Sequence, residues 1–255
     1  MILYYAMGGG LGHLTRGRRV LERLGIEAAF VTASPYARDP RVTGGFPVIE
    51  VPAQLEHDAD AHRAWIRSLK AERILVDSFP GGIQGELCGI DDVPMDYVAR
   101  LLKWSEYRKA VPGKLPQFET TYVVEELTHE VSGKTVPLNL AEWRDGLSAR
   151  PKGDDDGLRA RRSIVIHSGP DKEVNELLAY AEDLGYRDPT VITRCETYPA
   201  TSLFENASHI ISAAGFNVML ETEPFRHKHS VLPFPRRFDD QYTRAARRKA
   251  AVTDL

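Results

Sequence analysis

A histidine follows a cluster of glycines near the start of the chain. The segment Gly8-Gly9-Gly10-Leu11-Gly12 leads directly to His13, and an imidazole can accept or donate a proton near neutral pH. The backbone N–H groups of a glycine-rich loop, with the dipole of a following helix, can bind an anion such as a phosphate. We therefore expect Gly9, Gly10 and Gly12 to form an anion-binding loop that carries His13. The alternative is a tight turn in which the glycines serve only close packing.

The loop lies between a predicted strand and a predicted helix. Residues 2–6 form an apolar run typical of a buried strand. After the loop, apolar side chains recur with helical spacing and form one stripe. This stripe consists of Leu14, Val20, Leu21 and Leu24, with Gly17 on the same face.

Strands and helices alternate along the rest of the chain, which predicts βαβ units and parallel sheets. In the first half we expect strands at 28–31, 47–51, 73–77 and 120–124, and helices at 58–70 and 84–87. Residues 95–102 fit a strand or a helix, and we favour a strand. In the second half we expect strands at 163–166, 190–193, 209–212 and 231–232, and helices at 171–184, 202–206 and 239–249. The turn at 213–217 should lead into a further helix that runs through Glu221.

Residues 137–162 are polar and charged, which favours a linker between two domains. We therefore predict an α/β protein with one Rossmann-like domain at 1–150 and a second at 151–255. A cleft between the carboxyl ends of their strands would bind the ligand. Asp154-Asp155-Asp156 could suggest a metal site, but no strand positions these carboxylates and we interpret them as part of a solvated linker.

The composition is that of an ordinary globular protein, with 42% hydrophobic and 27% charged residues. A net charge of -3 gives no general case for nucleic acid or a membrane surface as partner. The two cysteines, Cys88 and Cys195, are far apart, which suits a reducing cytoplasm. The chain begins on a predicted strand and contains no apolar run of transmembrane length, so we expect no signal peptide and a cytoplasmic protein.

The C-terminal end is locally basic, with eight Lys and Arg residues against three Asp from Arg226 onward. These side chains could contact an anionic lipid surface, or they could belong to a solvated helix face. The arginines concerned are Arg236, Arg237, Arg244, Arg247 and Arg248.

Several loops after predicted strands carry polar residues. Ser168 and Gly169 could offer a hydroxyl and N–H groups to a phosphate. Gly215 precedes a predicted helix. It could form an anion site at the start of that helix, or it could serve only a tight turn. Asp240 and Gln241 begin the last helix, where the alternative role is N-capping. Asp77 ends a strong strand, and we consider it as a second candidate base or as a capping residue.

The second half resembles the donor-binding half of GT-B glycosyltransferases, and in particular the N-acetylglucosaminyltransferase family that completes the lipid-linked peptidoglycan precursor. The resemblance rests on Ala214–Glu221, Val231–Pro235 and Asp239–Gln241, and the loop ending in His13 is similar to the first loop of that family.

The resemblance implies a GT-B fold and transfer of a sugar from a nucleoside-diphosphate donor, which we expect to be UDP-linked, to an unidentified acceptor hydroxyl. It implies no metal ion and no cofactor. Donor binding would fall to the loop at Ser168 and Gly169 and, for the diphosphate, to Gly215 with the helix residues Phe216 and Asn217. Glu221 would bind the ribose, and Asp240 and Gln241 the sugar. His13 would face the reacting centre.

A second family is also similar. Gly12-His13-Leu14-Thr15-Arg16 resembles the Gly-His-x-x-Arg opening of small GT-B nucleotide-sugar hydrolases, whose histidine helps water attack the anomeric carbon. We favour the transferase and keep the hydrolase as the alternative. A third reading is a non-catalytic nucleotide-sugar binding module or a half-enzyme with a membrane partner.

Overall fold

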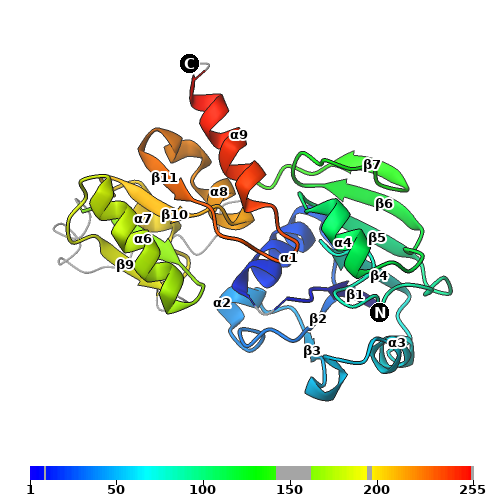
Figure 1. The fold of residues 1–255 in the computed structure, drawn as a ribbon. Helices are drawn as coiled ribbons and strands as arrows, with labels where there is room; N and C mark the ends of the chain where they lie inside the picture. Colours follow the sequence, from blue (N-terminus) through cyan, green and yellow to red (C-terminus); the bar gives the residue numbers. More distant parts are fainter. Residues whose placement is uncertain (9, 142–161, 194–196, 254–255) are drawn as a thin grey trace. The chain divides into compact units, whose positions relative to one another are not determined.

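The computed structural model describes residues 1–8, 10–141, 162–193 and 197–253 (Figure 1). The chain divides into two compact units, the first formed by Met1–Leu140 with Arg237–Asp239 and the second by Ala141–Arg236 with Asp240–Leu255. The predicted boundary at 150 and the carboxylates of Asp154–Asp156 lie outside the described residues. We did not anticipate from the sequence that Arg237–Asp239 would pack with the first unit.

The first unit contains a parallel sheet of seven strands among its described residues, in the order β3-β2-β1-β4-β5-β6-β7. The strands are β1 (Ile2–Tyr5), β2 (Ala29–Thr32), β3 (Val48–Glu50), β4 (Arg73–Asp77), β5 (Met95–Ala99), β6 (Phe118–Val123) and β7 (Lys134–Pro137). The helices are α1 (Leu11–Leu24), α2 (Pro40–Thr43), α3 (Ala59–Ser68) and α4 (Trp104–Ala110), with a 3₁₀ turn at Ala53–Leu55. The strand order reverses between β1 and β4, and ligands of open α/β sheets bind at such a point.

The second unit contains a parallel sheet of four strands among its described residues, in the order β11-β10-β8-β9. The strands are β8 (Ile164–His167), β9 (Thr190–Thr193), β10 (Ile210–Ala213) and β11 (His229–Leu232). The helices are α6 (Asp171–Asp183), α7 (Thr201–Phe204), α8 (Phe216–Glu221) and α9 (Gln241–Thr253), with a 3₁₀ segment at Glu223–Lys228. Here the order reverses between β8 and β10. Two parallel sheets with Rossmann-like order confirm the predicted α/β class.

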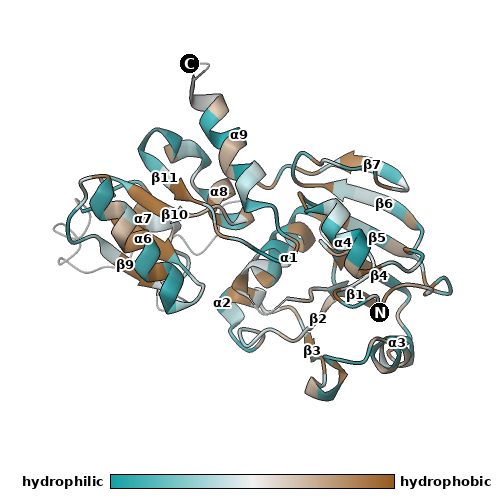
Figure 2. Ribbon diagram, viewed as in Figure 1, coloured by the Kyte–Doolittle hydropathy of each residue, from teal (hydrophilic) through white to brown (hydrophobic). Residues whose placement is uncertain are grey.

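Buried strands and amphipathic helices account for these cores. Residues of β10 are buried along its whole length, as expected for a strand covered on both faces. Figure 2 shows this strand in the hydrophobic colour and the outer turns of α6 in the hydrophilic colour. In the first unit, Tyr4 and Tyr5 point to opposite faces of the sheet. Tyr5 joins the apolar core that contains Ile66 of α3.

Gly17 lets α1 pack closely on the other face. A Cβ atom at this position would lie 2.6 Å from the Tyr4 ring and 2.5 Å from the Phe30 ring, closer than real contacts allow. The helix ends at Gly25, whose φ of 65° suits the left-handed C-cap conformation. Close packing is therefore the role of Gly17, while the glycines of residues 8–12 precede or open the helix.

Some predicted elements differ from the structure. Residues 84–87 form turns and not a helix, because Glu86 turns inward and accepts hydrogen bonds from the N–H groups of Ile83 and Gln84. The last helix begins at Gln241 and not at Asp239, since Asp239 forms an isolated antiparallel bridge with Leu102. Helices α2 and α4 and strand β7 were not predicted.

Candidate active site

The candidate catalytic side chains of the first unit lie at the carboxyl ends of β1 and β4. β1 and β4 are neighbours at the point where the strand order reverses. The glycine loop follows β1 and leads into α1, while Asp77 is the last residue of β4 and Ser78 follows it. Chain folding thus brings His13 and Asp77 together although 64 positions separate them.

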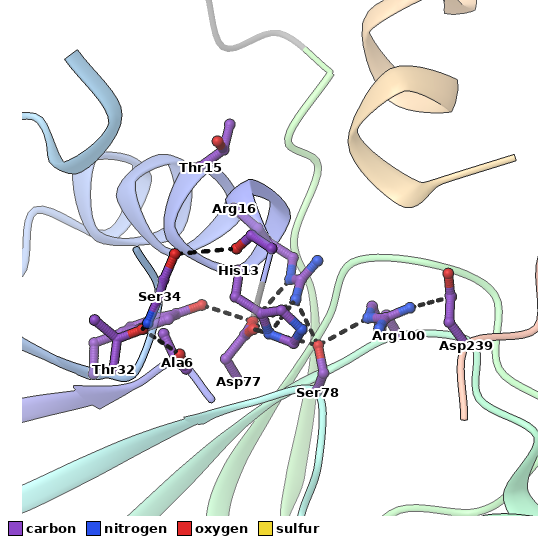
Figure 3. Close-up of polar contacts among 12 residues, drawn as sticks. Ala6, His13, Thr15, Arg16, Thr32, Ser34, Asp77, Ser78, Arg100 and Asp239 are labelled. Atoms are coloured by element: carbon purple, nitrogen blue, oxygen red, sulfur yellow. Dashed lines mark hydrogen bonds and ion pairs between the residues drawn. The ribbon is translucent and has the colours of Figure 1, made fainter. Parts of the chain in front are cut away.

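His13 and Asp77 form a short, largely buried pair (Figure 3). His13 Nδ1 lies 2.6 Å from Asp77 Oδ2, and the two side chains are 13% and 0% exposed. A carboxylate can only accept, so Nδ1 carries the proton and donates it to Asp77. The other ring nitrogen of a neutral His13, Nε2, then has a lone pair that can accept a proton.

Arg16 completes the cluster from the same face of α1, since residues three apart on a helix are neighbours. Its Nε donates to Asp77 Oδ1 at 2.8 Å and its Nη2 to Oδ2 at 2.5 Å. The Tyr4 hydroxyl also donates to Oδ1, at 3.0 Å. The carboxylate of Asp77 is therefore surrounded by donors from α1, namely His13 and Arg16, and by Tyr4 of β1.

Burial and charge act in opposite directions on Asp77. Burial alone would raise the pKa of this carboxyl, but the positive charge of Arg16 and the hydrogen bond from His13 outweigh it and hold the pKa well below its ordinary value. Asp77 is consequently ionised at neutral pH.

The pKa of His13 lies below its ordinary value. Burial is the largest cause, the hydrogen bond and charge of Asp77 act against it, and the charges of Arg16 and Arg100 lower the pKa further. The imidazole is therefore neutral at pH 7 and able to act as a base.

Gly8 leaves the space that His13 occupies. A Cβ atom at position 8 would lie 2.5 Å from His13 Nε2 and 2.4 Å from Cδ2, and the backbone φ is 153°. Gly10 is the N-cap of α1, and no side-chain cap and no acidic residue of the first turn occupies that end of the helix. Gly12 is the second residue of α1, and Gly9 lies outside the described residues. Among the described glycines of the loop, Gly8 is thus the one that the His13 ring approaches closely.

Three further residues connect to this cluster, and the sequence did not assign any of them to it. Ser78 Oγ accepts hydrogen bonds from Arg16 Nη2 at 2.7 Å and from Arg100 Nε at 2.8 Å. Arg100 in turn forms an ion pair with Asp239. The His13-x-x-Arg16 spacing was a usable signal for Arg16. Asp239 was noted from the sequence only as part of the Asp239–Gln241 segment, and nothing local indicated Ser78 or Arg100.

In the second unit, a second histidine cluster lies at the carboxyl end of β8, where His167 is the last residue of the strand. His167 Nε2 lies 2.6 Å from Glu173 Oε2, and Arg236 pairs with both oxygens of Glu173 at 2.6 and 2.5 Å. Gly169 lies against this cluster, because a Cβ atom there would be 2.3 Å from His167 Nε2. Ser168 is exposed. The acids Asp171 and Glu173 both lie in the first turn of α6 and complement its dipole.

The residues expected to bind the diphosphate and ribose lie at β10 and α8. Gly215 is the N-cap of α8, and no acid lies in the first turn of this helix. Phe216 is buried, while Asn217 and Glu221 are half-buried. The structure thus brings Gly215 and the first N–H groups of α8 to the carboxyl end of β10.

Asp240 and Gln241 have structural partners at the start of α9. Asp240 accepts hydrogen bonds from the backbone N–H and the hydroxyl of Thr243, at 3.0 and 2.8 Å, as an N-cap does. Gln241 is buried, and its Oε1 accepts a hydrogen bond from the Phe234 N–H at 3.0 Å.

Most of the C-terminal arginines named above have partners within the protein. Arg236 binds Glu173, Arg244 donates to the Ala214 carbonyl at 2.8 Å, and Arg248 pairs with Glu223. Arg244 and Arg248 are buried, so they are not part of a solvated helix face.

The residues that the structure describes show neither a membrane-spanning helix nor a metal-binding group of side chains. None of their helices is both long and apolar enough to cross a lipid bilayer. They also contain no group of three or more His, Cys, Asp or Glu side chains arranged to hold a metal ion.

No protein-family model and no curated protein matches this chain. Two solved structures are similar to it. The glycotransferase of kitacinnamycin is 14% identical, with 99% of this chain and 84% of that chain covered and a TM-score of 0.50. MurG of Acinetobacter baumannii is 16% identical, with 98% and 83% covered and a TM-score of 0.47. At 14% identity the likeness to the kitacinnamycin glycotransferase is one of fold alone, and the fold is of the GT-B type.

Proposed function

We propose that this protein transfers a sugar from a UDP-linked donor to an acceptor hydroxyl, with His13 as the general base. A GT-B fold alone does not define a reaction. The observation that carries the proposal is the His13–Asp77 pair at the reversal point of the first sheet, where His13 Nδ1 lies 2.6 Å from Asp77 Oδ2.

In this mechanism His13 Nε2 takes the proton of the acceptor hydroxyl as its oxygen attacks the anomeric carbon. The bond from that carbon to the diphosphate oxygen breaks, and the diphosphate leaves with the electron pair. A positioned base of this kind contributes roughly 10² to 10⁴-fold to the rate. The proton that His13 gains makes an imidazolium, which the ionised Asp77 stabilises.

We assign a positioning role to Asp77 and not that of the base. Its side chain is 0% exposed and accepts hydrogen bonds from Tyr4, Arg16 and His13. A carboxylate with its oxygens engaged in this way, and with a lowered pKa, is a weak proton acceptor. It fixes the tautomer and the orientation of the imidazole, as the acid of a catalytic triad does.

For the donor, we propose that Gly215 and the first N–H groups of α8, at Phe216 and Asn217, bind the diphosphate. Such groups stabilise charge that develops on a leaving group. Glu221 would bind the ribose hydroxyls, and Asp240 and Gln241 the sugar. We do not extend the diphosphate site to Ser168 and Gly169, because the acids of α6 already complement the dipole of that helix.

The test measures donor binding and turnover separately. Uridine diphosphate should raise the melting temperature of the protein, and this shift should disappear in Glu221→Ala and persist in His13→Gln. Turnover of UDP-sugars with candidate acceptors should be lost in His13→Gln. A His13→Gln variant with unchanged turnover would remove His13 from the mechanism, and the absence of any nucleotide-induced shift would contradict the donor site.

A second candidate is hydrolysis of the nucleotide sugar, in which His13 activates water. The observation that favours it is Arg16, the last residue of the Gly-His-x-x-Arg segment, which contacts Asp77 directly. Incubation with UDP-sugars alone separates the two reactions. Sugar release in water at a rate equal to that with acceptors supports the hydrolase, whereas release that depends on an acceptor supports the transferase.

A further inference from the structure

Ser78 has an unusual backbone conformation at the end of β4. Its φ is 67°, which is rare for a residue with a side chain. Its N–H donates to the Val98 carbonyl at 3.0 Å, and its carbonyl accepts from the Tyr97 hydroxyl at 2.8 Å. A strained conformation of this kind persists only where the surroundings hold it, and such residues gather at functional sites.

The Ser78 hydroxyl connects two buried arginines. Arg16 Nη2 donates to Oγ at 2.7 Å and Arg100 Nε at 2.8 Å. Arg16 holds Asp77, and Arg100 pairs with Asp239. Figure 3 shows this continuous line of contacts from Asp77 through Ser78 and Arg100 to Asp239. The side chains of Arg100 and Asp239 are 6% and 16% exposed, so water screens the pair weakly.

Asp239 belongs to a segment, Arg237–Asp239, that is anchored on the first unit. The Phe238 carbonyl accepts from the Lys103 N–H at 2.8 Å, and the Phe238 ring packs edge-on against Tyr107 with centroids 5.1 Å apart. The next two residues along the chain are Asp240 and Gln241, which the proposed function assigns to the donor sugar.

We propose that Arg100 is a positioning residue that, through Ser78, ties the His13–Asp77 pair to the segment Arg237–Asp239, so that this segment fixes the imidazole of the base. The inference rests on the proposed function for the role of His13. It adds a connection from the proposed base to the residue that directly precedes the proposed sugar-binding residues.

The charged and titratable groups around His13 set the sign of the expected effects. Arg16 lies on the same helix, Asp77 comes from β4 with Tyr4 bonded to it, and Arg100 follows β5 with Asp239 paired to it. The charge of Arg100 disfavours the imidazolium of His13 and lowers its pKa, in addition to the larger effect of burial. The negative charge of Asp239 offsets that of Arg100.

The first experiment is an NMR titration of the His13 ring in the free protein, with its resonance identified by its absence in His13→Gln. Arg100→Gln removes a positive charge and should raise the midpoint of the His13 titration by about half a pH unit. Asp239→Asn, which keeps the shape of the side chain, leaves Arg100 uncompensated and should lower the midpoint. If the substitutions only loosened the site, the His13 titration midpoint would shift in the same direction in both variants, toward that of an exposed histidine. That result would overturn the proposal.

The second experiment separates position from charge. Arg100→Lys keeps the charge but cannot reach Ser78 and Asp239 together, so it should broaden or abolish the downfield resonance of the His13 Nδ1 proton. Arg73→Gln is the matched control, because it removes an arginine paired with Asp96 at the opposite end of β4. Its midpoint and Nδ1 resonance should equal those of the wild type. An unchanged Nδ1 resonance in Arg100→Lys would also overturn the proposal.

Neither measurement requires turnover. Failure of the connection therefore shows in the titration, whereas failure of the proposed function shows as unchanged turnover in His13→Gln.

Discussion

Each unit contains a cluster of one histidine, one acidic residue and one arginine, and the two clusters are used differently. In the first unit His13 pairs with Asp77, which Arg16 holds through both oxygens. In the second unit His167 pairs with Glu173, which Arg236 holds in the same way. Both histidine–carboxylate distances are 2.6 Å.

The difference lies in where the acid comes from. Asp77 comes from β4, not from the helix that carries His13, and its side chain is 0% exposed. The first turn of α1 contains no acid. Glu173 lies in the first turn of α6 itself and is 16% exposed. The second cluster therefore complements its own helix dipole and holds its loop together, whereas the first leaves a helix N-terminus and a proton-accepting nitrogen for a ligand.

The largest expected contrast is in turnover. His13→Gln should lower kcat by roughly 10² to 10⁴-fold, because it removes the proposed base. His167→Gln should change kcat by less than about threefold, a small effect on the same scale. Steady-state rates of UDP-sugar turnover for the two variants provide the measurement. Equal losses in both would mean that the two clusters do not differ in the way we describe.

Stability should also differ between the two acids. Asp77→Asn leaves the Arg16 guanidinium buried without its carboxylate and should cost about 3–5 kcal/mol. Glu173→Gln affects a pair whose arginine is 30% exposed and should cost about 1 kcal/mol or less. Urea unfolding at pH 7 measures both. A loss in Glu173→Gln that matches Asp77→Asn would contradict the distinction between a buried and a screened pair.

The two glycines that face the histidines offer a third contrast. Gly8→Ala would place a Cβ atom 2.5 Å from His13 Nε2, and Gly169→Ala one 2.3 Å from His167 Nε2. Each should cost about 1–3 kcal/mol of stability from overpacking. Only Gly8→Ala should in addition lower kcat, by more than tenfold, because it displaces the proposed base. A comparison of kcat with the urea midpoint for each variant separates the two effects.

Residues that act locally were predictable from the sequence. Strand β4 was predicted at its observed bounds, and the glycine loop and His13 stood out because strand, glycines and helix follow one another directly. Arg16 lies within the same segment, at a helical spacing of three from His13.

Residues that act over a distance were not predictable. The sequence suggested Asp77 only as the end of a strand, and its contact with His13 exists because β1 and β4 are neighbours at the reversal point. Arg100 and Asp239 are 139 positions apart, and no local pattern links them. Asp240 shows a different limit of sequence reasoning, because an aspartate at the start of a helix fits both N-capping and sugar binding. The structure shows the bonds of the cap, to the backbone N–H and the hydroxyl of Thr243.

The smallest expected contrast is in the pH dependence of turnover. His13 must be neutral to accept a proton, and its pKa lies below the ordinary value near 6.5. The acid limb of kcat/KM should therefore fall below pH 6.5. The charge and hydrogen bond of Asp77 act to raise this pKa, so Asp77→Asn should move the acid limb to still lower pH while the rate itself drops. Glu173→Gln should leave the limb in place, because Glu173 contacts His167 and not His13. If the acid limb instead shifted in Glu173→Gln, His167 and not His13 would be the histidine that titrates in the reaction.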